Sequence, residues 1–144
     1  YLEKGAVVTD VGAVKSNVIK AINPIIPEGI FFVPAHPIAG TENSGPKAGF
    51  AELFNGRWCI LTPTSETPVR VINKIRDFWT LLGADVQEMD AIHHDLVLSV
   101  TSHAPHLIAF TMVGVADEFS KVTKSEVISK KTASRKISRI SKKI

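Results

Sequence analysis

The most informative stretch for the fold is Ile30-Phe31-Phe32-Val33-Pro34-Ala35-His36-Pro37-Ile38-Ala39-Gly40, because it joins an apolar run to a polar loop. The run at 30–33 is typical of a buried strand. Pro37 cannot donate a ladder hydrogen bond, so we expect the strand to stop beside His36. Residues 41–44 then add hydroxyl, carboxylate and amide groups. A histidine at this position can accept a proton near neutral pH, so the segment is a candidate active site.

Strands and helices alternate on both sides of this stretch. Short apolar runs predict further strands at 6–9, 57–61 and 85–88, and apolar spacings of three and four predict helices at 14–23, 68–82 and 91–119. This order indicates an α/β fold with a parallel sheet. The 144 residues are enough for about one domain. They contain no Gly-x-Gly-x-x-Gly turn, the element that holds a pyrophosphate in dinucleotide-binding folds.

Boundary residues refine the helices. Thr67 is expected to cap the helix at 68–82, and Gly83 to end it. Asp90 is expected to cap the last helix, which Pro105 should kink. The residues expected to face inward from the helix at 68–82 are Val71, Ile72, Ile75, Phe78, Trp79 and Leu82.

Composition sets broad limits. A hydrophobic content of 44% with 22% charged residues is ordinary for a globular protein. The single cysteine, Cys59, lies in an apolar run and is expected to be buried and inert. No uninterrupted apolar stretch reaches the roughly 18–20 residues that span a bilayer, so we expect no membrane partner and a cytoplasmic location. Residues 121–144 hold nine Lys or Arg and one Glu, so the basic pI belongs to the tail.

Four motifs in register resemble the prephenate and arogenate dehydrogenases of tyrosine biosynthesis. They are Thr9-Asp10-Val11-Gly12-Ala13-Val14-Lys15, His36-Pro37-Ile38-Ala39-Gly40-Thr41-Glu42, Ile60-Leu61-Thr62-Pro63 and Ser102-His103-Ala104-Pro105-His106. The resemblance covers roughly residues 1–128. It implies the C-terminal half of a Rossmann-type nucleotide-binding domain (1–89), followed by the start of an α-helical domain (90–128) and a divergent basic tail (129–144). The chain is therefore expected to be an internal fragment or a degraded copy, inactive by itself.

The resemblance also implies an activity, which is the oxidative decarboxylation of prephenate with NAD or NADP. His36 would be the catalytic base. Ala13 stands where the family has a serine that orients this histidine and touches the substrate hydroxyl, so weakened activity is expected. A homodimer is implied for the intact enzyme. The remaining implied contacts are Thr41, Glu42, His106 and Arg139 with substrate, and Asp10, Gly12 and Pro37 with cofactor.

Several alternatives remain open at this point. The substrate could be arogenate, or the chain could be a non-catalytic module whose basic tail binds nucleic acid or an acidic surface. The tail lacks aromatic residues for base stacking, so nucleic acid is not the expected partner. No metal is expected, since the adjacent His93 and His94 point about 100° apart on a helix. We interpret His93, His94 and Asp95 as a solvated helix face.

Overall fold

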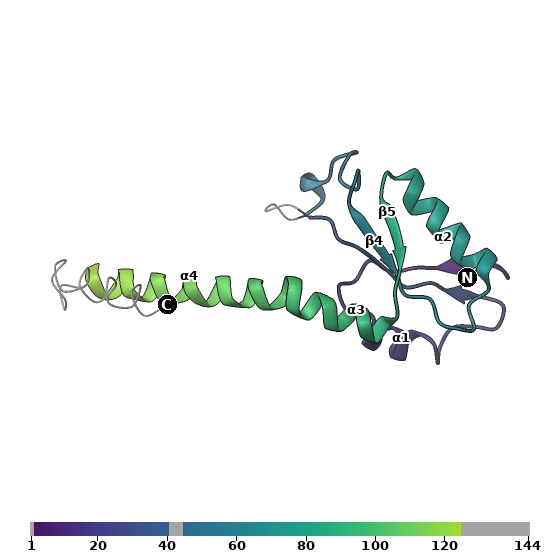
Figure 1. The fold of residues 1–144 in the computed structure, drawn as a ribbon, viewed down its shortest axis with the longest axis horizontal. Coiled ribbons are helices and arrows are strands. Elements are labelled where there is room, and N and C mark those ends of the chain that lie inside the picture. Colours follow the sequence, from purple (N-terminus) through teal and green to yellow (C-terminus); the bar gives the residue numbers. More distant parts are fainter. Residues whose placement is uncertain (1, 41–44, 125–144) are drawn as a thin grey trace. The chain divides into compact units, whose positions relative to one another are not determined.

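A computed structural model describes residues 2–40 and 45–124 (Figure 1). The chain divides into two compact units, residues 1–98 and 99–144, and the domain division expected near residue 90 stays a prediction. The strands are β1 (Val7–Val8), β2 (Phe31–Phe32), β3 (Ala35–Pro37), β4 (Trp58–Leu61) and β5 (Asp85–Glu88). The helices are α1 (Ser16–Ile22), a 3₁₀ turn (Pro46–Ala48), α2 (Val69–Leu81), α3 (Ala91–Leu98), a π-helical segment (Ser99–His103) and α4 (Ala104–Lys124).

The first unit holds two small sheets that share one extended segment, residues 31–37. β1 and β2 pair in parallel, while the second sheet has the order β3-β4-β5. Pro34 separates β2 from β3, because proline has no N–H to continue the ladder. Its carbonyl oxygen still accepts a hydrogen bond from the Thr62 backbone N–H at 3.0 Å. The segment therefore ties the β1–β2 pair to the three-stranded sheet, as an α/β Rossmann-type arrangement requires.

The expectation of an all-parallel sheet is wrong at β3, which pairs antiparallel with β4. The strand ends at Pro37, directly beside His36, as expected, and His36 itself pairs within β3 opposite Ile60. Pro37 is tolerated because hydrogen-bonded and non-hydrogen-bonded residue pairs alternate along an antiparallel ladder. The Ile38 N–H donates to the Trp58 carbonyl at 2.7 Å, which places Pro37 at a position whose N–H is not used.

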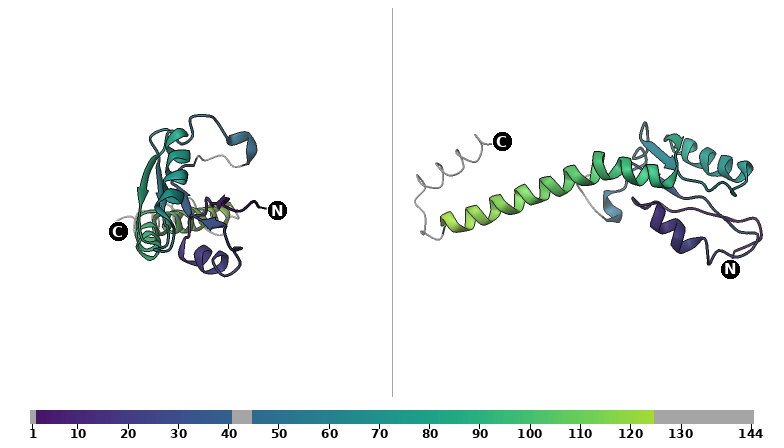
Figure 2. Two further views of the ribbon diagram at one scale, coloured as in Figure 1. Left: turned by 90° about the vertical axis from the view of Figure 1, so that its right-hand side faces the viewer. Right: turned by 60° about the horizontal axis from the view of Figure 1, so that its bottom comes forward.

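Helix α2 packs along β4 and β5 and supplies much of the core (Figures 1 and 2). Four of the six residues expected to face inward are buried, among them Trp79 at 3% exposure. Phe78 is 48% exposed and Leu82 is 36% exposed, so the buried face is narrower than expected. The other core residues come from β2 to β5 and the loops between them: Val33, Ala35, Cys59, Leu61 and Ala84.

The ends of α2 confirm one boundary prediction and correct another. Gly83 follows the helix with φ of 87°, a conformation that favours glycine, and the helix ends there as expected. Thr67 does not cap it. The N-cap position is Pro68, which offers no side-chain hydrogen bond, and the Thr67 hydroxyl instead lies 3.1 Å from the Thr64 hydroxyl.

Helices α1 and α3 lie side by side in the first unit (Figure 2). Asp90 caps α3 as expected, since its Oδ1 accepts hydrogen bonds from the backbone N–H groups of Ile92 and His93. Helix α1 has no side-chain cap at its own N-cap residue, Lys15. Asp95 of α3 fills this role, because its carboxylate accepts the backbone N–H groups of Lys15 and Ser16.

The second unit begins with the π-helical segment Ser99–His103 and continues as α4. The expected single helix is thus interrupted directly before Pro105, where the missing N–H and the ring disturb the regular ladder. The helix Ala91–Glu118 is long and apolar enough, by length and composition alone, to cross a membrane. Polar residues such as His94 and Thr101 interrupt its apolar residues, so no uninterrupted apolar run of that length marks it in the sequence.

Candidate active site

The turn after β1 is fixed by a buried ion pair. The Lys15 ammonium is fully buried, lies 2.5 Å from Asp10 Oδ2 and donates to the Ala35 carbonyl at 2.7 Å. Asp10 also accepts the backbone N–H groups of Gly12 at 2.9 Å and Ala35 at 3.2 Å. These bonds tie the end of β1 to the first residue of β3. They therefore set the position of His36, the next residue.

Gly12 is required by this arrangement. A Cβ atom at residue 12 would lie 2.9 Å from Asp10 Oδ2 and 3.8 Å from Lys15 Nζ. The first distance is shorter than real Cβ contacts, so any side chain would displace the Asp10 carboxylate from its ion pair. The contacts expected from Asp10 and Gly12 to a cofactor stay predictions. In the structure the Asp10 carboxylate binds groups of the protein itself, namely the Lys15 ammonium and the backbone N–H groups of Gly12 and Ala35.

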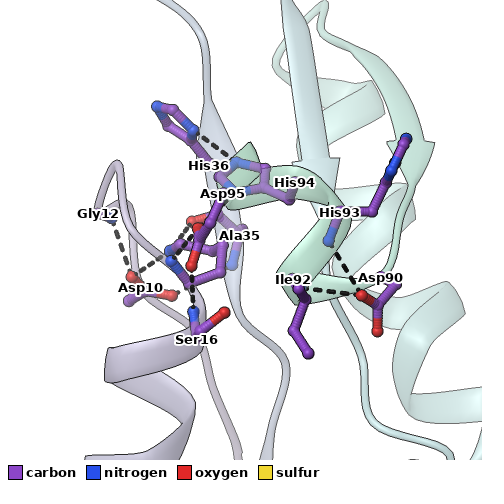
Figure 3. Close-up of polar contacts among 11 residues, drawn as sticks. Asp10, Gly12, Ser16, Ala35, His36, Asp90, Ile92, His93, His94 and Asp95 are labelled. Carbon is purple, nitrogen blue, oxygen red and sulfur yellow. Dashed lines mark hydrogen bonds and ion pairs between the residues drawn. The ribbon is translucent and has the colours of Figure 1, made fainter. Parts of the chain in front are cut away.

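His36 faces a second histidine (Figure 3). Its Nδ1 lies 2.9 Å from Nε2 of His94, and the two rings meet edge to face with centroids 5.1 Å apart. His36 is half-buried, whereas His94 is completely buried. The two residues lie 58 positions apart in the sequence and reach each other from β3 and α3.

Asp95 continues the chain of contacts. His94 Nδ1 lies 2.9 Å from Asp95 Oδ1, and the Asp95 carboxylate accepts the backbone N–H groups of Lys15 at 2.8 Å and Ser16 at 2.9 Å. Burial would raise the pKa of Asp95, but the hydrogen bonds from Lys15, Ser16 and His94 outweigh it and hold this pKa well below its usual range. Asp95 is therefore an ionised acceptor at neutral pH.

The interpretation of His93, His94 and Asp95 as a solvated helix face is wrong for His94. Adjacent helical residues do point apart, and His93 is exposed as expected. His94 faces inward together with Leu98, four residues later. This i, i+4 pair was the available signal, because residues at that spacing share a helix face. What the sequence could not give is the partner, since His36 comes from a different element.

The other expected site residues are placed as follows. Ala13 is exposed, and Pro37 is half-buried at the end of β3. His106 is exposed and belongs to the second unit, together with His103. Thr41, Glu42 and Arg139 lie outside the described residues. The substrate contacts expected of these residues stay predictions, as does the cofactor contact expected of Pro37.

Cys59 behaves as expected. It is completely buried and free of any disulfide, and burial raises the pKa of its thiol to about 12. The thiolate needed for nucleophilic chemistry is therefore not formed near neutral pH. Within residues 2–40 and 45–124, no three His, Cys, Asp or Glu side chains are grouped so that they could hold a metal ion.

The site can therefore perform proton transfer. The ionised Asp95 carboxylate contacts the buried imidazole of His94, which in turn contacts the half-buried imidazole of His36. His36 lies beside the turn that follows β1. Histidine is the side chain best suited to accept a proton near neutral pH. The β1 turn beside it lies where parallel α/β sheets bind nucleotides.

Comparisons with known proteins agree with this geometry. Residues 1–88 match the family described as prephenate dehydrogenase, nucleotide-binding domain. The chain is 44% identical over 127 residues to cyclohexadienyl dehydrogenase of Zymomonas mobilis, covering 88% of this chain and 43% of that protein. It is 34% identical over 112 residues to prephenate dehydrogenase of Bacillus subtilis, covering 78% of this chain and 30% of that protein.

A solved structure gives the same result. Prephenate dehydrogenase from Aquifex aeolicus, studied in complex with hydroxyphenyl propionate and NAD+, superposes with a TM-score of 0.72 at 38% identity. The match covers 79% of this chain and 39% of that one. The chain thus spans less than half the length of these relatives. The family match over residues 1–88 and the shared fold show that the chain belongs to the prephenate dehydrogenase family.

Proposed function

We propose that this chain supplies the catalytic base of an NAD-dependent enzyme that converts prephenate to 4-hydroxyphenylpyruvate and carbon dioxide. The observation that supports this is the position of His36 in β3, held against His94 and next to the β1 turn. NAD, when bound, accepts the hydride that leaves the ring carbon bearing the hydroxyl group.

The residues of the β1 turn fit a nicotinamide. The turn follows a parallel strand, at the end of the sheet where dinucleotides bind. Val11 is 64% exposed and Val14 is 42% exposed, so the turn offers apolar surface to a flat ring. Asp10 and Gly12 shape the turn, and Pro37 ends the neighbouring strand. These three are the proposed cofactor contacts, and NADP is the alternative cofactor.

His36 has the proton-transfer role. The substrate's hydroxyl proton moves to His36 as the carbon–oxygen bond becomes a carbonyl, and loss of carbon dioxide then restores an aromatic ring. Proton transfer of this kind contributes about 10²–10⁴-fold in rate. Thr41, His106 and Arg139 are proposed to bind the substrate, with Glu42 at the mouth of the site. Ala13 leaves the substrate hydroxyl without a serine partner.

Arogenate is the second candidate substrate. Both compounds are cyclohexadienes with the same ring hydroxyl, and the Zymomonas relative is described by that ring alone. The chemistry at His36 would be identical. We further propose a cytoplasmic homodimer for the intact enzyme, and the basic tail at 129–144 as a divergent segment rather than a nucleic-acid-binding one.

The test joins residues 1–128 to the remaining segments of the Zymomonas enzyme. We expect this chimera to reduce NAD with prephenate or arogenate, and the relative kcat/KM for the two substrates assigns the preference. His36→Asn should lower kcat by about 10²–10⁴-fold with little change in KM, because it removes the proton acceptor but keeps a polar side chain. An active His36→Asn chimera would exclude His36 as the base.

A further inference from the structure

We propose that His94 and Asp95 are positioning residues that hold the proton of neutral His36 on Nδ1, so that Nε2 is the atom that receives the substrate's proton. This proposal rests on the proposed function for its consequence in catalysis. Its structural part, the position of one proton, can be tested without any substrate. The three side chains concerned are shown in Figure 3.

The contacts from Asp95 through His94 to His36 form a relay, which starts at the N-terminus of α1. The backbone N–H groups of Lys15 and Ser16 both donate to the Asp95 carboxylate, at 2.8 and 2.9 Å. Helix α1 has no side-chain cap at Lys15, so Asp95 supplies from α3 the acceptor that the first turn lacks. A carboxylate held by backbone donors stays ionised and can only accept hydrogen bonds. The direction of the next bond is thereby fixed.

His94 must then donate through Nδ1. Its Nδ1 lies 2.9 Å from Asp95 Oδ1, and a lone pair on that nitrogen would face the oxygen lone pairs. The His94 ring is completely buried, and its two nitrogens contact Asp95 on one side and His36 on the other. A neutral ring with its proton on Nδ1 has its lone pair on Nε2. His94 therefore presents an acceptor to His36.

The last bond selects the tautomer of His36. Its Nδ1 lies 2.9 Å from the acceptor Nε2 of His94, so Nδ1 carries the proton and Nε2 carries the lone pair. A neutral histidine in water has the proton on Nε2 more often than on Nδ1. The relay thus favours the less common tautomer. The negative charge of Asp95 lies at the other end of these contacts, where it stabilises the imidazolium that forms when His36 accepts a proton.

Among the described residues, the neighbouring carboxylate of Asp10 has other partners. Asp10 is bound to the Lys15 ammonium, and that pair is closed by the Ala35 backbone. Asp95 contacts Lys15 only through its backbone N–H. Among residues 2–40 and 45–124, Asp95 is the carboxylate that contacts His94, and it reaches His36 through that ring. The family resemblance assigned orientation of His36 to a serine at position 13, whereas here His94 provides it.

The decisive measurement is the proton position of His36 in the 144-residue chain. Long-range ¹H–¹⁵N correlation spectra of histidine-labelled protein distinguish the protonated ring nitrogen from the unprotonated one. Resonances are assigned by comparison with His36→Asn and His94→Leu. We expect the proton of neutral His36 on Nδ1 and that of His94 on Nδ1. A proton on Nε2 of His36, or a doubly protonated His94, in the unaltered chain would overturn the proposal.

Variants provide the matched comparison. His94→Leu removes the acceptor and should return His36 to the tautomer with the proton on Nε2. His94→Gln can present its amide oxygen to His36 and should retain the proton on Nδ1. His93→Leu is the control, since His93 is the exposed neighbour on the same helix, and it should change nothing. An unchanged His36 tautomer in folded His94→Leu would also refute the relay.

Activity of the chimera separates the two proposals. If His36 has the expected tautomer and the chimera is inactive, the relay stands and the proposed function fails. If the chimera is active, His94→Leu should lower its kcat by about 10²–10⁴-fold, as loss of the correct tautomer does in serine proteases, with KM nearly unchanged. His94→Gln should recover part of this loss, which a purely structural role for His94 would not predict.

Discussion

The Lys15 ammonium and the Asp10 carboxylate form an ion pair of 2.5 Å in which the lysine is completely buried. The pair joins the turn after β1 to the start of β3, through the Ala35 backbone. A buried ion pair contributes little net stability, but removing one partner leaves an uncompensated buried charge. The pair therefore matters most as a fixed link between the turn and the strand that holds His36.

This link predicts a non-additive effect on stability. Asp10→Ala should reduce the free energy of unfolding by about 3–5 kcal/mol, because the Lys15 ammonium would remain buried with only the Ala35 carbonyl. Adding Lys15→Met should restore part of that loss, since the uncompensated charge is gone. Urea unfolding monitored by the fluorescence of the buried Trp79 measures both. Additive losses would show that the two side chains do not depend on each other.

Asp95 predicts a dependence of stability on acid. Its pKa is lower in the folded chain than in the unfolded chain, where it is about 3.9. Its contribution is therefore fully present above that value and is lost as the pH falls below it toward the folded-state pKa. Asp95→Asn should be less stable than the unaltered chain at neutral pH, and the difference should shrink on acidification. Urea midpoints measured between about pH 6 and pH 3 test this. A constant difference across that range would contradict it.

Position 13 predicts a modest gain in activity. Ala13→Ser in the chimera restores a hydroxyl group that can contact the substrate, and one hydrogen bond contributes about 0.5–1.5 kcal/mol, or roughly two- to tenfold in rate. Since His94 already holds His36, we do not expect a larger effect. Steady-state kcat values compared with those of His94→Leu decide which residue orients the base. A gain in kcat well above tenfold would indicate that the residue at position 13, rather than His94, orients His36.

Helix α4 predicts self-association. Its exposed apolar side chains include Leu107, Phe110, Val113 and Val115, and Leu96 of α3 and Val100 of the π-helical segment are exposed as well. Burying such side chains contributes about 1.5–3 kcal/mol each, so the 144-residue chain should associate as its concentration rises. Light scattering of the double variant Leu107→Gln, Phe110→Gln should show weaker association. Phe50→Gln is the control, because Phe50 is an exposed apolar residue outside α4.

The outcome of the α4 experiment also bears on the membrane. If lipid vesicles rather than a second chain bind α4, the double variant should lose vesicle binding in a flotation assay. A monodisperse unaltered chain at high concentration, with no vesicle binding, would contradict the expected association.

The 144 residues by themselves predict no turnover. They contain no Gly-x-Gly-x-x-Gly turn to hold the pyrophosphate of NAD, so the nicotinamide would not be anchored near His36. Absorbance of reduced cofactor during incubation with prephenate measures this directly. Steady cofactor reduction by the purified chain would contradict the prediction.

Local sequence patterns were sufficient to predict several elements and their ends. β5 is found as expected at Asp85–Glu88, α2 ends before Gly83, and Asp90 caps α3. These features depend on backbone preferences and on side chains within a few residues of one another. The family and the location of His36 near the sheet could likewise be inferred, because motifs are contiguous in the sequence.

Which side chains meet depends on how distant elements pack, and the sequence patterns did not predict it. Pro37 could enter a strand because β3 runs antiparallel to β4, so the missing N–H falls at an unused position. His94 is buried because α3 packs within the first unit, beside α1, and brings the His94 ring against His36. The contact between His36 and His94 joins residues 58 positions apart, so it depends on how whole elements pack. Local periodicity in the sequence does not predict that packing. The relay from Asp95 to His36 is therefore a property of the fold rather than of any one segment.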